Sequence, residues 1–176
     1  MGRGGTLPPV PRRKRNRLKD YDYSQKGAYF VTICTDKRKE LFGKIITGAE
    51  PCNTILSPVG KIVEEEIKHF SRVYDTLYVD CYVIMPNHVH LILVIGSNNE
   101  RQGAAPTPTL SQMVGGWKRK VSIRAGFSPW QKSFHEHIIS NETDYQRIAE
   151  YIEYNPLLWE DDLYFKEIGR QGAARY

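Results

Sequence analysis

The stretch Leu77-Tyr-Val-Asp-Cys-Tyr-Val-Ile-Met-Pro-Asn-His-Val-His-Leu-Ile-Leu-Val-Ile95 contains two runs rich in β-branched and aromatic residues, separated only by Pro86-Asn87. Runs of this composition are typical of strands. A connection of two residues is long enough only to join neighbouring antiparallel strands. The stretch therefore predicts an antiparallel hairpin made of residues 77–85 and 88–95.

The segments around this hairpin predict the rest of a βαββαβ order. Ser57-Pro58 places a capping residue before a proline, which is a strong signal for the start of a helix. Further strands are expected over residues 28–35 and 134–140, a short edge strand over 41–46, and helices over 58–70, 110–124 and 143–154. Gly115-Gly116 weakens the second helix. The order predicts an α+β, ferredoxin-like antiparallel sheet with helices on one face and an added C-terminal helix.

Length and composition are those of one domain. The chain has 176 residues, of which 40% are apolar, so it can bury a real core. No apolar run approaches the roughly 18 residues that a membrane span needs, and we expect a soluble protein with no membrane partner. Cys34, Cys52 and Cys81 form no C-x-x-C pair and follow no secretory leader. This pattern favours a reducing compartment, the cytoplasm.

Positive charge is concentrated in an N-terminal arm. Seven of the 25 lysines and arginines lie within residues 1–19, which contain no acid. Such an arm suits a polyanion, because neutralised phosphates release condensed counterions. The residues there that we expect to contact phosphate groups are Arg12, Arg13, Lys14, Arg15 and Arg17. A solvated tail or an address signal would have the same composition.

A second basic cluster combines cations with aromatic residues. Lys118, Arg119 and Lys120 follow Trp117, and Trp130 lies nearby in the sequence. Base stacking together with phosphate contacts would use this mixture, so the three cations are candidate DNA-binding residues. The outer face of an amphipathic helix with its aromatics in the core is an equally good interpretation.

Two histidine pairs could bind a metal ion. His88 and His90 are two apart on a predicted strand, so both side chains project to the same face. Two adjacent imidazoles are half of a divalent-metal site. His135 and His137 have the same spacing on another predicted strand, and spacing alone does not choose between the pairs. Packing or surface roles remain open for both.

The last predicted helix carries a tyrosine and an asparagine on one face. Tyr151 and Asn155 are four residues apart, which places them one turn from each other. Asn155 precedes Pro156, where a helix usually stops. An amide at the end of this helix could complete a metal site with a phenol one turn away. With 11 tyrosines in the chain, ordinary packing is the alternative for Tyr151.

Four blocks of the sequence resemble one family. Met85-Pro-Asn-His-Val-His-Leu-Ile-Leu93 is similar to the motif of the HUH nucleases, two histidines flanking an apolar residue. Tyr151-Ile-Glu-Tyr-Asn-Pro156 resembles the Y-I-x-x-N-P stretch of the REP-associated tyrosine transposases, a single-tyrosine branch of that superfamily. Arg17-Leu-Lys-Asp-Tyr-Asp-Tyr23 and Trp130-Gln-Lys-Ser-Phe-His-Glu-His-Ile-Ile139 also resemble that branch, in the same order.

The resemblance implies a single-strand DNA endonuclease and strand transferase. By matched position, Tyr151 would be the nucleophile that forms a 5′-phosphotyrosine, and His88, His90 and Asn155 would bind Mg2+ or Mn2+. Residues 1–19 would be a flexible arm, residues 20–160 the HUH transposase domain and residues 161–176 a tail. The expected partner is single-stranded DNA from hairpin-forming repeats. The protein would be a monomer or homodimer, cytoplasmic and associated with the nucleoid.

Two other functions remain open at this point. One is a catalytically silent nucleic-acid-binding protein that uses the same sheet as a platform. The other is a small metallohydrolase built on both histidine pairs, and its catalysis would survive a Tyr151→Phe substitution.

Overall fold

The computed structural model describes residues 22, 25–46, 54–96, 108–157 and 159. The basic arm and the C-terminal tail lie outside these ranges, so the predicted domain boundaries stay predictions. The strands are β1 (Gly27–Cys34), β2 (Gly43–Ile45), β3 (Thr54–Leu56), β4 (Leu77–Met85), β5 (His88–Ile95) and β6 (His135–Ile139). The helices are the short 3₁₀ turn η1 (Asp36–Arg38), α1 (Pro58–Val73), α2 (Leu110–Ala125) and α3 (Glu142–Tyr154).

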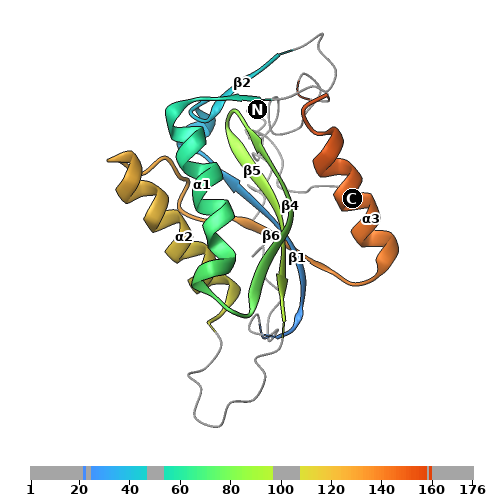
Figure 1. Ribbon diagram of the computed structural model, residues 1–176. Coiled ribbons are helices and arrows are strands. Elements are labelled where there is room, and N and C mark those ends of the chain that lie inside the picture. The colour runs from blue at the N-terminus through green and yellow to red at the C-terminus, as the bar shows by residue number, and fades with distance from the viewer. Residues whose placement is uncertain (1–21, 23–24, 47–53, 97–107, 158, 160–176) are drawn as a thin grey trace, which may run out of the picture.

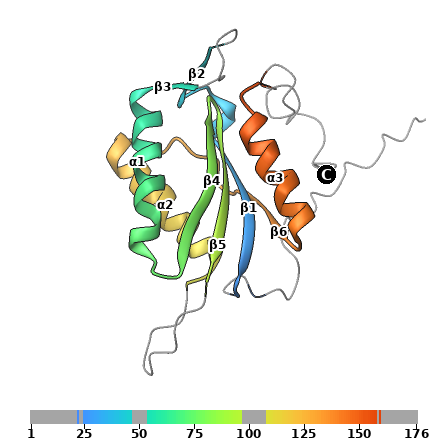
Figure 2. The same cartoon turned by 45° about the vertical axis from the view of Figure 1, so that its right-hand side comes forward.

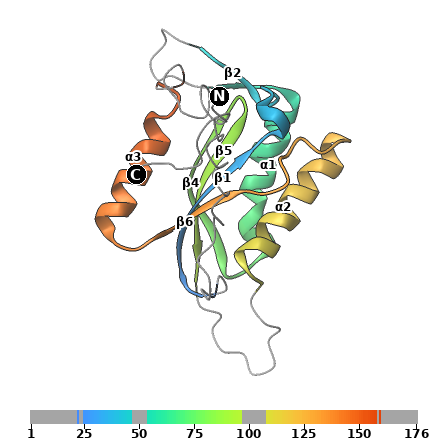
Figure 3. The ribbon, with the colours of Figure 1, turned by 180° about the vertical axis from the view of Figure 1, so that it is seen from behind.

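The main sheet has the strand order β4-β5-β1-β6, and every neighbouring pair in it is antiparallel. This is the ferredoxin-like topology predicted from the sequence, and the predicted hairpin is β4 and β5 with the expected bounds. Helices α1 and α2 cover one face, whereas the added helix α3 lies against the other (Figure 1). Figures 2 and 3 show the same three layers from other sides.

The predicted edge strand at residues 41–46 is β2, but it belongs to a separate two-stranded sheet with β3. The sequence did not predict β3, because three residues are too short for an alternating pattern to be visible.

The alternation of side chains along β1 divides the interior into two clusters. Tyr29, Val31 and Ile33 point toward α1 and α2 and belong to the larger core. Phe30 points to the opposite face, where it packs with Ile92 and with α3. A residue's position in the strand therefore determines whether it meets the two-helix layer or α3.

Helix α2 is the helix expected over residues 110–124, and it runs without interruption through Gly115-Gly116. Thr109 and Gln112 form a capping box at its start, and Gly126 ends it in the left-handed conformation. Its buried face packs into the core through Leu110, Met113, Val114, Trp117 and Val121. Burial of this face outweighs the helix propensity that two glycines lose, about 1 kcal/mol each.

Helix α3 is fixed to the sheet at its first turn and along one face. The Asn141 side chain caps the helix by accepting from the Asp144 N–H at 2.9 Å. The Asp144 carboxylate also contacts Nε2 of His137 on β6 at 2.7 Å. Further along, Ile148 and Ile152 are buried against the sheet. These contacts set the rotation of α3, and so the face on which Tyr151 lies.

Among the described helices, none is both long and apolar enough to cross a membrane.

Candidate functional site

The candidate site is built on the first residues of β5. His88 and His90 lie on the sheet face that α3 covers, and neither has any exposed surface. Their Nε2 atoms are 3.0 Å apart, so the two imidazoles converge on one point. The spacing of two residues on a strand produces this convergence, as the sequence predicts.

Each imidazole is oriented through its other nitrogen. Nδ1 of His88 lies 2.7 Å from Oδ1 of Asn87, and since an amide oxygen only accepts, the imidazole donates. Nδ1 of His90 is hydrogen-bonded to the Thr32 hydroxyl of β1 at 2.8 Å. Partners of this kind fix the ring and the tautomer of a metal-binding histidine. Because Nδ1 of His88 carries the proton that it donates to Asn87, Nε2 of His88 keeps a lone pair directed into the site.

Tyr151 approaches the histidines from α3. Its hydroxyl lies 3.4 Å from Nε2 of His90, and the two rings meet edge to face with centroids 5.3 Å apart. Phe30 of β1 contacts both of them, stacked on His90 and edge-on to Tyr151. The tyrosine is half-buried, whereas the histidines are fully buried. The phenol therefore lies between the histidine pair and the surface.

Asn155 completes the arrangement one turn beyond Tyr151. It is the C-terminal cap of α3 and only 1% exposed, and the ring of Trp159 stacks on His88 nearby. The amide lies close enough to His88 to favour the protonated form of that imidazole, but neither Nδ2 nor Oδ1 makes a well-formed hydrogen bond to a described residue. Leaving such a group unsatisfied costs about 1–3 kcal/mol. A buried amide in this state beside two converging imidazoles is a candidate ligand for an ion.

These side chains fit a small divalent cation. Two nitrogens 3.0 Å apart match adjacent positions of an octahedron with bonds of about 2.1 Å. The amide oxygen of Asn155 is a hard ligand of the kind that Mg2+ and Mn2+ prefer. In the part of the chain described here, no three His, Cys, Asp or Glu side chains cluster as a metal site. A site at this position therefore depends on the asparagine.

Burial keeps both histidines neutral at physiological pH. It lowers the pKa of His90 to about 3. Burial also lowers the pKa of His88 well below its usual range, and the neighbouring His90 and Arg38 contribute in the same direction. Neutral imidazole is the protonation state that binds a metal ion.

In the metal-free protein, we expect the free energy of unfolding to fall as the pH drops below about 6.5. The unfolded chain then takes up protons that the buried imidazoles do not accept, and His90 in the folded protein accepts one only near pH 3. Between pH 7.5 and pH 5, the lowered pKa of His90 alone should reduce the free energy of unfolding by about 2 kcal/mol. Urea unfolding at both pH values measures this loss. His90→Gln should reduce the pH dependence of the free energy of unfolding. His69→Gln, which removes an exposed imidazole, is the control and should not reduce it. The same change in unfolding free energy between the two pH values in both variants would contradict the prediction.

The second histidine pair does not join the first. His135 and His137 lie on β6 and project to the α3 face, but β1 separates β6 from β5. Thr32 of β1 pairs with His90 on one side and with His135 on the other. His137 contacts Asp144 of α3 instead. The two histidine pairs are therefore not on neighbouring strands.

The predicted DNA-binding cations on α2 are not gathered at this site. Residues 12–17 lie outside the described residues. On α2, which covers the opposite face, the Lys118 ammonium donates to the carbonyl of Gln131 at 2.7 Å. Trp117 and Trp130 are buried and belong to the core rather than to a stacking surface.

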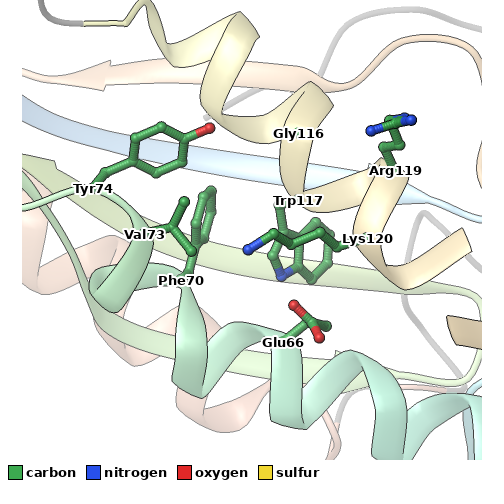
Figure 4. A pocket seen from close by; sticks show the side chains of 8 residues that line it. All are labelled: Glu66, Phe70, Val73, Tyr74, Gly116, Trp117, Arg119 and Lys120. Atoms are coloured by element: carbon green, nitrogen blue, oxygen red, sulfur yellow. The ribbon is translucent and has the colours of Figure 1, made fainter. Parts of the chain in front are cut away.

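Arg119 and Lys120 line a cavity of about 160 Å3 between α1 and α2. Figure 4 shows Lys120 and Trp117 of α2 facing Glu66 and Phe70 of α1 across it. This cavity lies on the side of the sheet away from the histidines.

Sequence reasoning missed the residues that orient the site. Thr32 is a polar residue in an otherwise apolar strand, and Asn87 directly precedes the first histidine. Both features are visible in the sequence, but only the strand register shows that Thr32 lies opposite His90.

Comparison with known proteins supports the fold. No protein-family model matches the chain. The chain is 35% identical over 173 residues to an uncharacterized protein of Haemophilus influenzae. The aligned region covers 87% of this chain and 93% of that protein. A solved structure of a REP-associated tyrosine transposase bound to a REP hairpin matches with a TM-score of 0.58 and 22% identity, over 80% of this chain and 72% of that one.

A crystal structure of a candidate transposase from Deinococcus radiodurans R1 matches with a TM-score of 0.45 and 19% identity. It covers 78% of this chain and 95% of that chain. The first structural match confirms the fold that the sequence resemblance implies.

Proposed function

The chain belongs to the family of the Haemophilus influenzae protein and has the fold of a tyrosine transposase, and we propose that it is a single-strand DNA endonuclease and strand transferase. One observation carries the proposal. The Tyr151 hydroxyl lies 3.4 Å from an imidazole nitrogen that is itself 3.0 Å from a second one. The proposed nucleophile, two imidazole nitrogens and the buried amide of Asn155 thus lie close together.

The proposed reaction is a transesterification at phosphorus. The Tyr151 oxygen forms a bond to the phosphorus of a phosphodiester, and the bond from phosphorus to the 3′ oxygen breaks. The phenol proton is lost and the departing oxygen gains a proton, so the products are a 5′-phosphotyrosine and a free 3′-OH. Because one ester replaces another, a 3′-OH can reverse the step without an external energy source.

His88, His90 and Asn155 would hold the divalent cation. When bound, Mg2+ or Mn2+ polarises the phosphate and neutralises charge that develops on the leaving oxygen. The residues of this chain provide the remaining requirements. Asn87 and Thr32 hold the imidazoles in place, and Phe30 and His90 position the phenol ring. A phenol with a pKa near 10 needs such an environment to act as a nucleophile near pH 7.

The two alternative functions have less support. A binding platform needs an open sheet face, but α1 and α2 cover one face and α3 the other (Figure 2). A hydrolase with four histidines needs both pairs in one site, and β1 separates them. The tyrosine-based reaction uses the side chains that converge.

The proposal is tested by incubating the full-length protein with Mn2+ and single-stranded DNA that contains a hairpin. The DNA carries a label at its 3′ end in one reaction and at its 5′ end in another. A denaturing gel should show the 3′ label joined covalently to protein, and the 5′ label in a shorter fragment that a polymerase can extend. Cleavage without a protein–DNA band would refute the proposal and favour hydrolysis.

A further inference from the structure

The turn that follows β1 holds an unusual backbone next to the candidate site. Lys37 and Arg38 have φ values of 51° and 54°, so two successive residues other than glycine are left-handed. Each such residue costs of order 1 kcal/mol or more, and strain of this kind persists only where the surroundings impose it. Strained backbone concentrates at functional sites, and this turn directly follows the strand that pairs with the two histidines.

The surroundings that impose the turn include the backbone of the site itself. The N–H of Thr35 donates to the carbonyl of Asn87 at 2.9 Å, and the Thr35 hydroxyl lies 3.0 Å from the same carbonyl and 2.8 Å from that of Lys39. From the other side, the N–H of Asp36 donates to the carbonyl of Pro129 at 2.7 Å. The side chain of Asn87 orients His88. The turn and the first histidine thus share one support.

This turn directs Arg38 back toward the histidines. The Arg38 side chain is half-buried, and its Nη2 lies 3.8 Å from the thiol of Cys34, the last residue of β1. Cys34 pairs with His88 in the sheet, so the two lie side by side. Paired residues of neighbouring strands project to the same face, so the thiol of Cys34 lies on the face that carries the histidines. The guanidinium that contacts this thiol therefore lies at the edge of the site.

Arg38 supplies the site with a guanidinium. The other side chains of the site are imidazoles, an amide and a phenol, and none of them presents a charged fork of N–H donors. A phosphodiester that enters the site brings a negative charge and two non-bridging oxygens. A guanidinium presents a planar fork of N–H donors that matches such a pair of oxygens.

We propose that Arg38 binds the non-bridging oxygens of the DNA phosphate that Tyr151 attacks. This inference rests on the proposed function and adds to it a residue that contacts the substrate. The strained turn would then hold the guanidinium of Arg38 beside the histidines. Asn87 supports both, since its carbonyl accepts from Thr35 before the turn and its side chain orients His88. A lysine at this position would keep the charge but not the two-pronged contact.

The test compares Arg38→Ala, Arg38→Lys and Lys39→Ala in the labelled-DNA reaction. Lys39 is the matched control, since it is an exposed cation next to Arg38. Arg38→Ala should slow formation of the protein–DNA adduct about 100-fold, as loss of one oxyanion donor does. It should also reduce the salt dependence of single-strand binding by about 0.7 in slope. Arg38→Lys should restore the slope but only part of the rate, and Lys39→Ala should stay within about threefold of wild type.

Three outcomes would count against Arg38. If Arg38→Ala behaves as Lys39→Ala does, the inference fails and the proposed function stands. If Arg38→Ala loses the stabilisation that Mn2+ gives, the residue acts through the metal site and does not bind phosphate. If the wild-type protein forms no adduct at all, the proposed function fails and the inference with it.

Discussion

Replacing Tyr151 by phenylalanine should abolish the covalent protein–DNA adduct, with a loss of at least about a thousandfold in its rate of formation. The substitution removes the one atom that attacks phosphorus, and no neighbouring group can replace an absent nucleophile. The ring contacts with His90 and Phe30 do not involve the hydroxyl, so the fold and the position of α3 should be kept. DNA binding should therefore change little, because the charge of the protein is unaltered.

Tyr154→Phe is the matched control for this substitution. Tyr154 lies on the same helix, three residues further, but is 52% exposed and makes no ring contact with the histidines among the described residues. Its loss should leave the rate of adduct formation near that of wild type. The measurement is the amount of 3′-labelled DNA that migrates with protein on a denaturing gel over time. An adduct that persists in Tyr151→Phe and disappears in Tyr154→Phe would assign the chemistry to the wrong tyrosine.

The sequence predicts the secondary-structure elements that local residue patterns determine. It does not predict features that depend on contacts between residues far apart in the chain. The bounds of β4 and β5 are predicted because β-branched composition and a two-residue connection act within the hairpin. Helix α2 tolerates Gly115-Gly116 only because its opposite face is buried in the core, which no local pattern reveals. Propensity was overruled there by packing.

The same division holds within the candidate site. The two-residue spacing predicts that His88 and His90 share a face, and the four-residue spacing does the same for Tyr151 and Asn155. Nothing in the spacing tells which face of the sheet α3 covers, and that choice brings the two pairs together. The approach of Arg38 depends on a left-handed turn without glycine, and the sequence contains no signal for it.

Asn155→Leu should raise the free energy of unfolding of the metal-free protein and, at the same time, weaken the binding of the divalent cation. The amide of Asn155 is buried beside His88, and neither polar atom makes a well-formed hydrogen bond to a described residue. An apolar side chain of similar shape removes that unsatisfied group, so the metal-free variant should be more stable than wild type by about 1 kcal/mol or more. The same change removes the third ligand that we propose for the cation.

In wild type, Mn2+ at a hundred times its dissociation constant should raise the free energy of unfolding by about 2.7 kcal/mol. In Asn155→Leu this increase should disappear, and adduct formation should fall with it. Urea unfolding with and without Mn2+ measures both effects, and His69→Gln controls for metal bound at an exposed histidine. If Asn155→Leu is more stable than wild type and Mn2+ still raises its free energy of unfolding, Asn155 is not a ligand of the metal ion. A variant that is less stable without metal would mean that the amide has a structural partner, and the argument from its burial would fail.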